Sequence, residues 1–186
     1  DVRGSRPVDN SPDEFQLIEQ GAWYGWPDYT GGLPVTLPQF RPEGYAPVRL
    51  LLAHLPMTPP RPYATFAAHS ATMGFDFNYN PAFGRAGDAY IAEFGSEAPE
   101  TTGGKPAPTV GHRVSIIDMQ TGAVRTFAIN KTGMAASATG GGGFERPIDA
   151  VFGPDGALYV VDFGLAGEEE DDYLTGTGVI WRITKE

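Results

Sequence analysis

The chain of 186 residues contains no cysteine, which excludes disulfides, thiolate metal sites, a cysteine nucleophile and covalent haem attachment. Positive charge is also scarce: 13 Lys and Arg residues stand against 23 Asp and Glu, for a net charge of −10. Nucleic-acid phosphates require a basic face, so we expect no nucleic-acid partner. No apolar run approaches the roughly 20 residues that cross a bilayer, and no signal peptide is present. We therefore expect no membrane span.

Glycine and proline, by contrast, are abundant, with 25 and 17 residues. This composition suits many turns and long loops. Because 41% of the residues are hydrophobic, the chain has enough apolar surface for a core and general disorder is not expected. No stretch shows a convincing amphipathic helical period, and the sequence predicts an all-β fold.

A pattern that occurs twice is the strongest signal in the sequence. Residues 75–95 and 150–164 both contain a short apolar run, a turn with Gly and Asp, and an aromatic-aliphatic-acidic-Phe-Gly ending. The second copy matches four residues of the first at a spacing of 69: Tyr90 with Tyr159, Glu93 with Asp162, Phe94 with Phe163, and Gly95 with Gly164. Self-similarity with short strands indicates a repeat architecture, and we predict a β-propeller, whose functional site lies at the mouth of its central channel.

The repeat extends beyond these hairpins. Residues 113–129 contain two strand-like segments joined at Gln120–Gly122, and residues 178–184 match the first of them, as do residues 14–18. The sequence therefore predicts about 2.5 four-stranded antiparallel blades of a propeller. We read the chain as one domain fragment, residues 1–186, with a partial blade and long loop in 1–60, a full blade in 64–130 and the last blade in 145–186.

A propeller typically closes with about four to eight blades, and fewer blades leave sheet faces and strand edges bare. The charged opening Asp-Val-Arg-Gly-Ser-Arg-Pro is typical of mid-protein sequence. We expect the chain to be the C-terminal part of a longer protein. Its expected partner is the missing N-terminal half of the propeller, with a second copy of the chain as the alternative.

Residues 3–36 resemble the glucose/sorbosone dehydrogenase family, and Tyr24-Gly25-Trp26-Pro27 is the most specific element of the likeness. Weaker matches follow in residues 69–77, 92–96, 145–164 and 178–183. The resemblance implies a secreted or periplasmic six-bladed propeller that uses pyrroloquinoline quinone (PQQ) and calcium to oxidise a small sugar. In that family, a His takes a proton while the quinone takes a hydride, and the ion polarises the quinone. The family's catalytic His comes from the first half of the propeller, so the resemblance places no catalytic residue in this chain.

The resemblance also suggests where the cofactors bind. Family members bind calcium through backbone carbonyls of a loop that corresponds to Arg3–Pro7, which makes Gly4 and Ser5 the predicted metal ligands. Arg146 falls where the family has a basic residue for the cofactor's carboxylates; the alternative is that it pairs with Glu145 or Asp149 and holds the start of the blade. The second Arg of the soluble glucose enzymes is replaced here by Ile148. The family's Lys contact has no secure match.

Three nearby residues are candidates for that Lys contact, namely Lys105, His112 and Arg113, and His112 is included in the predicted cofactor site. His69 precedes an inner strand, where it would touch a ligand or transfer a proton; the alternative is that it caps the strand. Glu93 and Asp162 end equivalent strands. Because a catalytic group has no reason to recur, we expect them to make structural hydrogen bonds within each blade. For Trp23, Tyr24 and Trp26, packing is favoured over sugar binding.

Three functions are compatible with these residues. The first is the C-terminal half of a PQQ- and calcium-dependent sugar dehydrogenase, which would not be active alone. The second is a non-catalytic propeller, a scaffold or binding module with a degenerate cofactor site, and Ile148 favours it. The third is a calcium-dependent hydrolase or lactonase, for which only Glu93 and Asp162 offer side-chain ligands.

Overall fold

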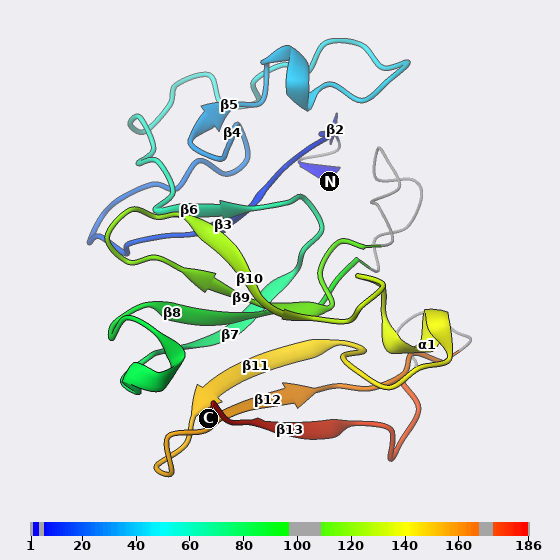
Figure 1. The fold of residues 1–186 in the computed structure, drawn as a ribbon. Coiled ribbons are helices and arrows are strands. Elements are labelled where there is room, and N and C mark those ends of the chain that lie inside the picture. Colours follow the sequence, from blue (N-terminus) through cyan, green and yellow to red (C-terminus); the bar gives the residue numbers. More distant parts are fainter. Residues whose placement is uncertain (1, 4–5, 97–108, 168–172, 186) are drawn as a thin grey trace. The chain divides into compact units, whose positions relative to one another are not determined.

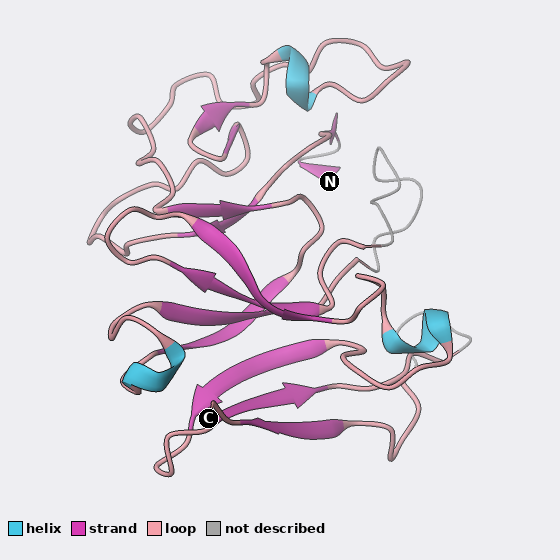
Figure 2. Cartoon of the chain, in the orientation of Figure 1, coloured by secondary structure: helices cyan, strands magenta, loops and turns pink. Residues whose placement is uncertain are grey.

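The computed structural model describes residues 2–3, 6–96, 109–167 and 173–185. These residues form two compact units, which are treated separately: unit 1 ends at His69, and unit 2 begins at Ser70. The structure is all-β, as the sequence predicts, and its antiparallel sheets are consistent with part of a β-propeller (Figure 2).

Unit 2 contains two antiparallel sheets (Figure 1). The first has the strand order β10-β9-β8-β7 and the second the order β11-β12-β13. Their bounds are β7 Thr72–Phe77, β8 Ala89–Glu93, β9 Arg113–Ile117, β10 Val124–Ile129, β11 Pro147–Phe152, β12 Leu158–Asp162 and β13 Val179–Ile183. Each sheet is a meander in which consecutive strands pair, as expected of propeller blades.

The strands form where β-branched and aromatic residues are bounded by turn residues. The turn between β11 and β12 is an example. Gly156 has a φ of 74°, which side chains disfavour, and its N–H donates to the Gly153 carbonyl at 2.8 Å. The Gly-Pro-Asp-Gly sequence therefore forms the tight hairpin that its residues predict.

The predicted repeat is confirmed by the pairing register. Phe77 lies opposite Ala89 in the first sheet, and Phe152 lies opposite Leu158 in the second. Both hairpins also carry an irregularity near the start of their first strand, between Thr72 and Phe75 and between Pro147 and Asp149. The two hairpins thus share register and bulge position, and their sequence similarity reflects one repeated structural unit.

The core of unit 2 lies between the two sheets. Its largest group is a set of aromatic rings with centroids 5.0–6.1 Å apart, contributed by Phe83, Tyr90, Phe127 and Phe152. A side chain also joins the sheets: the carboxylate of Asp76 in β7 accepts from the Phe152 N–H in β11 at 2.9 Å. The first strands of the two sheets therefore lie side by side, in the arrangement of consecutive propeller blades.

Unit 1 contains only short strand pairs. These are β1 Val2–Arg3 with β2 Arg6–Pro7, β3 Asp13–Phe15 with β6 Ala64–Phe66, and β4 Tyr29–Thr30 with β5 Leu33–Pro34. The strand expected at 14–18 ends at Phe15, and Ile18 is 84% exposed. Residues 64–66, which the sequence groups with the full blade, pair with β3 of unit 1 instead.

Helices are minor elements of the fold. They are single turns, η1 Pro38–Phe40, η2 Pro81–Phe83 and α1 Ala136–Thr139. Within the described ranges, no helix has the length and apolar character needed to cross a membrane.

Candidate functional site

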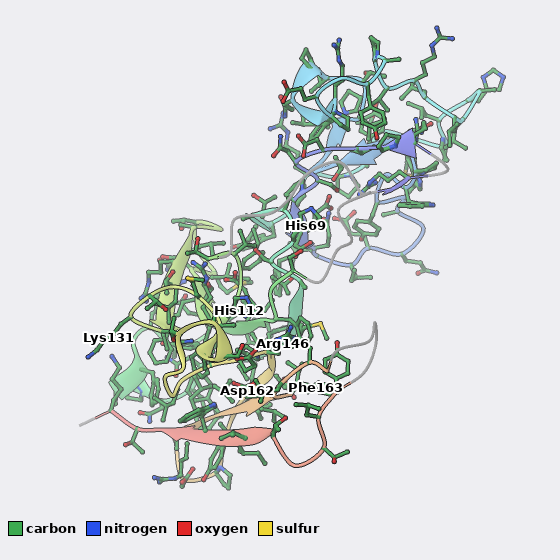
Figure 3. All side chains as sticks on the ribbon, turned by 90° about the vertical axis from the view of Figure 1, so that its right-hand side faces the viewer. His69, His112, Lys131, Arg146, Asp162 and Phe163 are labelled. Atoms are coloured by element: carbon green, nitrogen blue, oxygen red, sulfur yellow. The ribbon has the colours of Figure 1, made fainter. Side chains whose placement is uncertain are left out.

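The predicted cofactor residues of unit 2 lie where β8 and β12 end and where β9 and β11 begin. His112 immediately precedes β9, and Arg146 immediately precedes β11. Both lie near Asp162 in the side-chain view (Figure 3). The structure thus brings Arg146 and His112 into one region, and Glu145 is the residue that connects them.

Arg146 is held by contacts at both its ends. Its backbone N–H donates to Asp162 Oδ1 at 2.8 Å. Its guanidinium forms an ion pair with Glu145 at 2.8 Å and lies over the Phe94 ring at 5.5 Å. The side chain is 14% exposed. A guanidinium in this position can face a carboxylate, but an incoming ligand would have to compete with Glu145.

Glu145 itself is largely saturated. Its carboxylate accepts from the Ser137 N–H at 2.8 Å and from the Ser137 hydroxyl at 2.7 Å, in addition to Arg146. The residue is 6% exposed. Because a buried carboxylate needs these partners, the Glu145–Arg146 pair has a structural role whatever else it does.

His112 is fixed by its backbone and its ring. Its φ is 54°, in the left-handed region. Nδ1 lies 2.6 Å from the Glu145 carbonyl oxygen, so it is Nδ1 that carries the proton, leaving Nε2 as an acceptor when the ring is neutral. A Cβ at Gly95 would lie 2.5 Å from the His112 ring. Gly95 is therefore required for this packing, which explains the glycine of the repeated Phe-Gly ending in this blade.

His69 belongs to unit 1 and is described with it. Its φ is 68°, again left-handed. Burial lowers the pKa of His69 below its ordinary value of 6.5, and the carboxylates of Asp13 and Asp9 oppose that shift. A pKa below 6.5 favours the neutral imidazole at pH 7, and only a neutral imidazole can accept a proton.

The paired acids Glu93 and Asp162 are both buried, with 4% and 3% exposure. Asp162 accepts from the N–H groups of Glu145 at 2.7 Å, Arg146 at 2.8 Å and Gly164 at 3.2 Å. Asp162 thus fixes the start of β11. The expected structural role is confirmed for Asp162.

Glu93 has a similar setting in the other sheet. Its carboxylate accepts from the Ser115 hydroxyl and lies 3.6 Å from Arg113. Both groups come from the neighbouring strand β9, so Glu93 ties β8 to β9. A carboxylate with such partners is poorly placed to serve as a ligand of a catalytic cation, which weakens the hydrolase reading.

The predicted calcium ligands Gly4 and Ser5, and the candidate Lys105, lie outside the described residues. The residues that flank the loop are described, and both present buried or half-buried guanidinium groups, Arg3 and Arg6. In the described ranges, no group of three His, Asp or Glu residues could hold a metal ion. Their guanidiniums bond to Tyr29 and Ser11 and to Pro27 and Asp28, and calcium binding by the loop stays a prediction.

The aromatic residues of unit 1 are partly packed and partly exposed. Trp23 donates to the Trp26 carbonyl at 2.8 Å and meets the Tyr29 ring edge-on at 5.7 Å. Trp26 is 59% exposed and lies 5.0 Å from the Arg3 guanidinium. Trp23 therefore packs as expected, whereas Trp26 leaves much of its surface uncovered.

The ion pair with Glu145, which is the structural alternative for Arg146, is confirmed, whereas the contact between Glu145 and His112 was not predicted. Tyr45 and Arg49, which line a pocket in unit 1, were not predicted either. Residues 43–63 carry no periodicity that could have revealed that pocket. Comparison with models of known protein families and with curated proteins finds no match to this chain.

Proposed function

We propose that the chain contributes two consecutive blades and the flanking loops of a propeller-type sugar dehydrogenase, in which Arg146 receives a carboxylate of the quinone PQQ. The single observation that carries this proposal is the position of Arg146. It is a nearly buried guanidinium over an aromatic ring, at the start of the first strand of a repeated blade. A planar guanidinium in such a setting suits a planar, carboxylate-bearing cofactor.

The sheet faces of unit 2 support the propeller part of the proposal. Val114 of β9 is fully buried between the two sheets, whereas Ile180, at the same register position in β13, is 67% exposed. The second sheet thus covers this face of the first sheet. The equivalent face of the second sheet is uncovered. Exposed apolar sheet surface of this kind is normally covered by a partner.

We propose that a further blade covers this face, supplied by the missing N-terminal half of the propeller; a second copy of the chain is the alternative supplier. On the opposite outer face, Met73, Phe75 and Phe77 of β7 are 43–48% exposed. Both outer faces of the two-sheet stack therefore retain the apolar surface that a neighbouring blade would bury.

Within this function the residues of the chain have limited roles. Arg146 binds and orients a carboxylate, Phe94 supports the guanidinium, and Asp162 holds the backbone of the strand start. The quinone supplies the hydride acceptor when bound. Proton transfer at the sugar is assigned to residues outside this chain, and secretion or a periplasmic location follows only from the resemblance.

The second candidate is a non-catalytic propeller scaffold or binding module. The specific observation in its favour is the Glu145–Arg146 ion pair at 2.8 Å, which already neutralises the guanidinium. The two candidates differ in one measurable property, which is whether Arg146 binds the quinone.

Titration calorimetry of the full chain with PQQ, with and without calcium, separates the two candidates. We expect binding that is weakened about tenfold or more by Arg146→Gln, since a charge-assisted hydrogen bond contributes about 1.5–3 kcal/mol. Arg125→Gln is the matched control, because Arg125 is exposed on β10. No binding by the unaltered chain, or equal binding by Arg146→Gln, would favour the scaffold.

A further inference from the structure

A pocket of about 350 Å³ lies in unit 1, apart from the residues proposed to receive the quinone. Pockets of this size accept small organic molecules. It is lined by β2 on one side and by a loop segment on the other, with the residues Arg6, Pro7, Tyr45, Ala46, Pro47, Val48 and Arg49. Two of these seven residues are arginines, in a chain whose net charge is −10.

Arg6 is positioned by the surrounding structure. Its Nε donates to the Arg3 carbonyl at 3.1 Å, and its Nη2 donates to the Pro27 carbonyl at 3.1 Å and to Asp28 at 3.0 Å. Its side chain is 13% exposed. The guanidinium is therefore pre-organised, which lowers the entropy that a ligand must overcome on binding.

Arg49 differs from Arg6 because it has no partner. It is exposed, and within the described ranges it forms no hydrogen bond or ion pair. A long cationic side chain that lines a pocket and is not tied to the protein is available to a bound anion. The pocket thus combines one fixed and one adaptable guanidinium.

The cluster around Arg6 has more donors than acceptors. Among the described residues, Arg6 Nη1 and Arg3 Nε are buried and have no hydrogen-bond partner. Asp28, the nearby carboxylate, already accepts from the N–H groups of Leu51 and Leu52 at 2.8–3.0 Å. The described acceptors around Arg6 therefore do not neutralise both guanidiniums, which leaves positive charge at this end of the pocket.

The charge on Arg3 and Arg6 points the same way. Arg6 Nε donates to the Arg3 carbonyl, and the Arg3 guanidinium donates to the Tyr29 carbonyl at 2.6 Å and to the Ser11 hydroxyl at 3.2 Å. Two guanidiniums held near each other in a partly dry environment repel one another, so a bound anion would relieve their repulsion.

The remaining walls are apolar. Pro7, Pro47 and Val48 offer hydrocarbon surface, and Tyr45 is a half-exposed ring. An inorganic anion would leave this surface unused. An anion with a flat apolar body would bury it and gain roughly 25 cal/mol for each Å² removed from water.

We propose that this pocket binds a small organic carboxylate with an apolar or aromatic body, recognised by Arg6 and Arg49. The carboxylate meets the two guanidiniums, and the body lies against Tyr45, Pro47 and Val48.

The test is an NMR titration of the full chain with benzoate, with benzamide as the neutral molecule of the same shape. We expect benzoate to bind at least about tenfold more tightly than benzamide, because a charge-assisted hydrogen bond contributes about 1.5–3 kcal/mol. Arg49→Gln should remove most of this preference, while Arg41→Gln, another exposed arginine of unit 1, should leave it unchanged.

Other variants and probes make the test decisive. Tyr45→Ala should weaken benzoate and benzamide alike, because it removes apolar contact. Equal binding of benzoate and benzamide, or benzoate binding that Arg49→Gln leaves intact, overturns the proposal. If phosphate displaces benzoate at a similar concentration, the claim that the ligand needs an organic body is overturned. Arg146→Gln should not affect benzoate, so this outcome is independent of quinone binding.

Discussion

The two units of this chain are stabilised in different ways. Unit 2 is made of two sheets whose strands have five or six residues, with an aromatic core between them. Unit 1 has strands of two or three residues, and its segments are joined by side chains that bond to distant backbone groups. Arg3 donates to the Tyr29 carbonyl at 2.6 Å, and Glu14 accepts from the Gly31 N–H at 2.5 Å.

This difference shows how a chain rich in glycine and proline can still be well ordered. Where the sequence alternates and repeats, backbone ladders satisfy the polar groups and apolar side chains meet in the core. Where it does not, charged side chains must satisfy the backbone instead. Unit 1 therefore combines a few ionisable groups with a small core of Val8, Val35, Phe40 and Val48, whereas unit 2 depends on packed rings.

The largest expected effect is a loss of unfolding free energy in unit 2 when its aromatic core is disrupted. Phe152→Ala removes a ring that is 6% exposed and contacts Phe83 and Tyr90. We expect unit 2 to lose about 3–5 kcal/mol of unfolding free energy. Hydrogen exchange measured by segment should show the loss in residues 70–167, with unit 1 less affected.

Phe77→Ala is the matched control for this change. Phe77 occupies the same register position in the first hairpin but is 46% exposed. Phe77→Ala should therefore lower the unfolding free energy of unit 2 by clearly less than Phe152→Ala does. Equal losses for the two substitutions would show that the repeat has equivalent cores, contrary to the burial described here.

The next effect tests the charged network of unit 1. Asp28 is fully buried and accepts from Leu51, Leu52 and Arg6. Asp28→Ala leaves Arg6 without its carboxylate and two N–H groups unpaired, and we expect a loss of about 3 kcal/mol. Faster hydrogen exchange in residues 6–66, with unit 2 unchanged, is the expected result; uniform loss in both units would contradict the division.

The smallest effect is a pH dependence of unit 1. Burial opposes ionisation of Asp28, but hydrogen bonds from Leu51 and Leu52 and the charge of Arg6 outweigh it and hold the pKa of Asp28 below its ordinary 3.8. The stabilisation is therefore complete above the unfolded pKa and is lost as pH falls through the folded one.

Denaturation of the chain between pH 5 and the acid limit measures this dependence, at a slope of at most about 1.4 kcal/mol per pH unit for one proton. Asp28→Asn should flatten that part of the profile for unit 1. An unchanged slope in this variant would assign the acid sensitivity to other carboxylates.

The predictions from sequence were best where the repeat was clear. The register shared by Phe77 and Phe152, the Gly153–Gly156 turn and the structural role of Asp162 all followed from local residue patterns. Such patterns are reliable because turn chemistry and strand alternation act over a few residues. The end of β3 at Phe15, by contrast, could not be predicted from the sequence.

The candidate sites were harder to predict because they depend on contacts between distant residues. The position of Arg146 followed from a motif and its pairing with Glu145 from adjacency, but the place of the guanidinium over Phe94 and the contact of Glu145 with His112 required the fold. The pocket between Arg6 and Arg49 had no sequence signal at all. Residues 8–44 separate its two sides, and this segment contains no described strand longer than three residues.

The sequence by itself determined that this protein is an all-β chain with a repeated hairpin, because strand and turn preferences are local properties of neighbouring residues. Only the tertiary structure decided which charges meet, which faces stay uncovered and which donors lack acceptors. Charge pairing and burial depend on segments that are far apart in the chain, and no local pattern records where those segments come together.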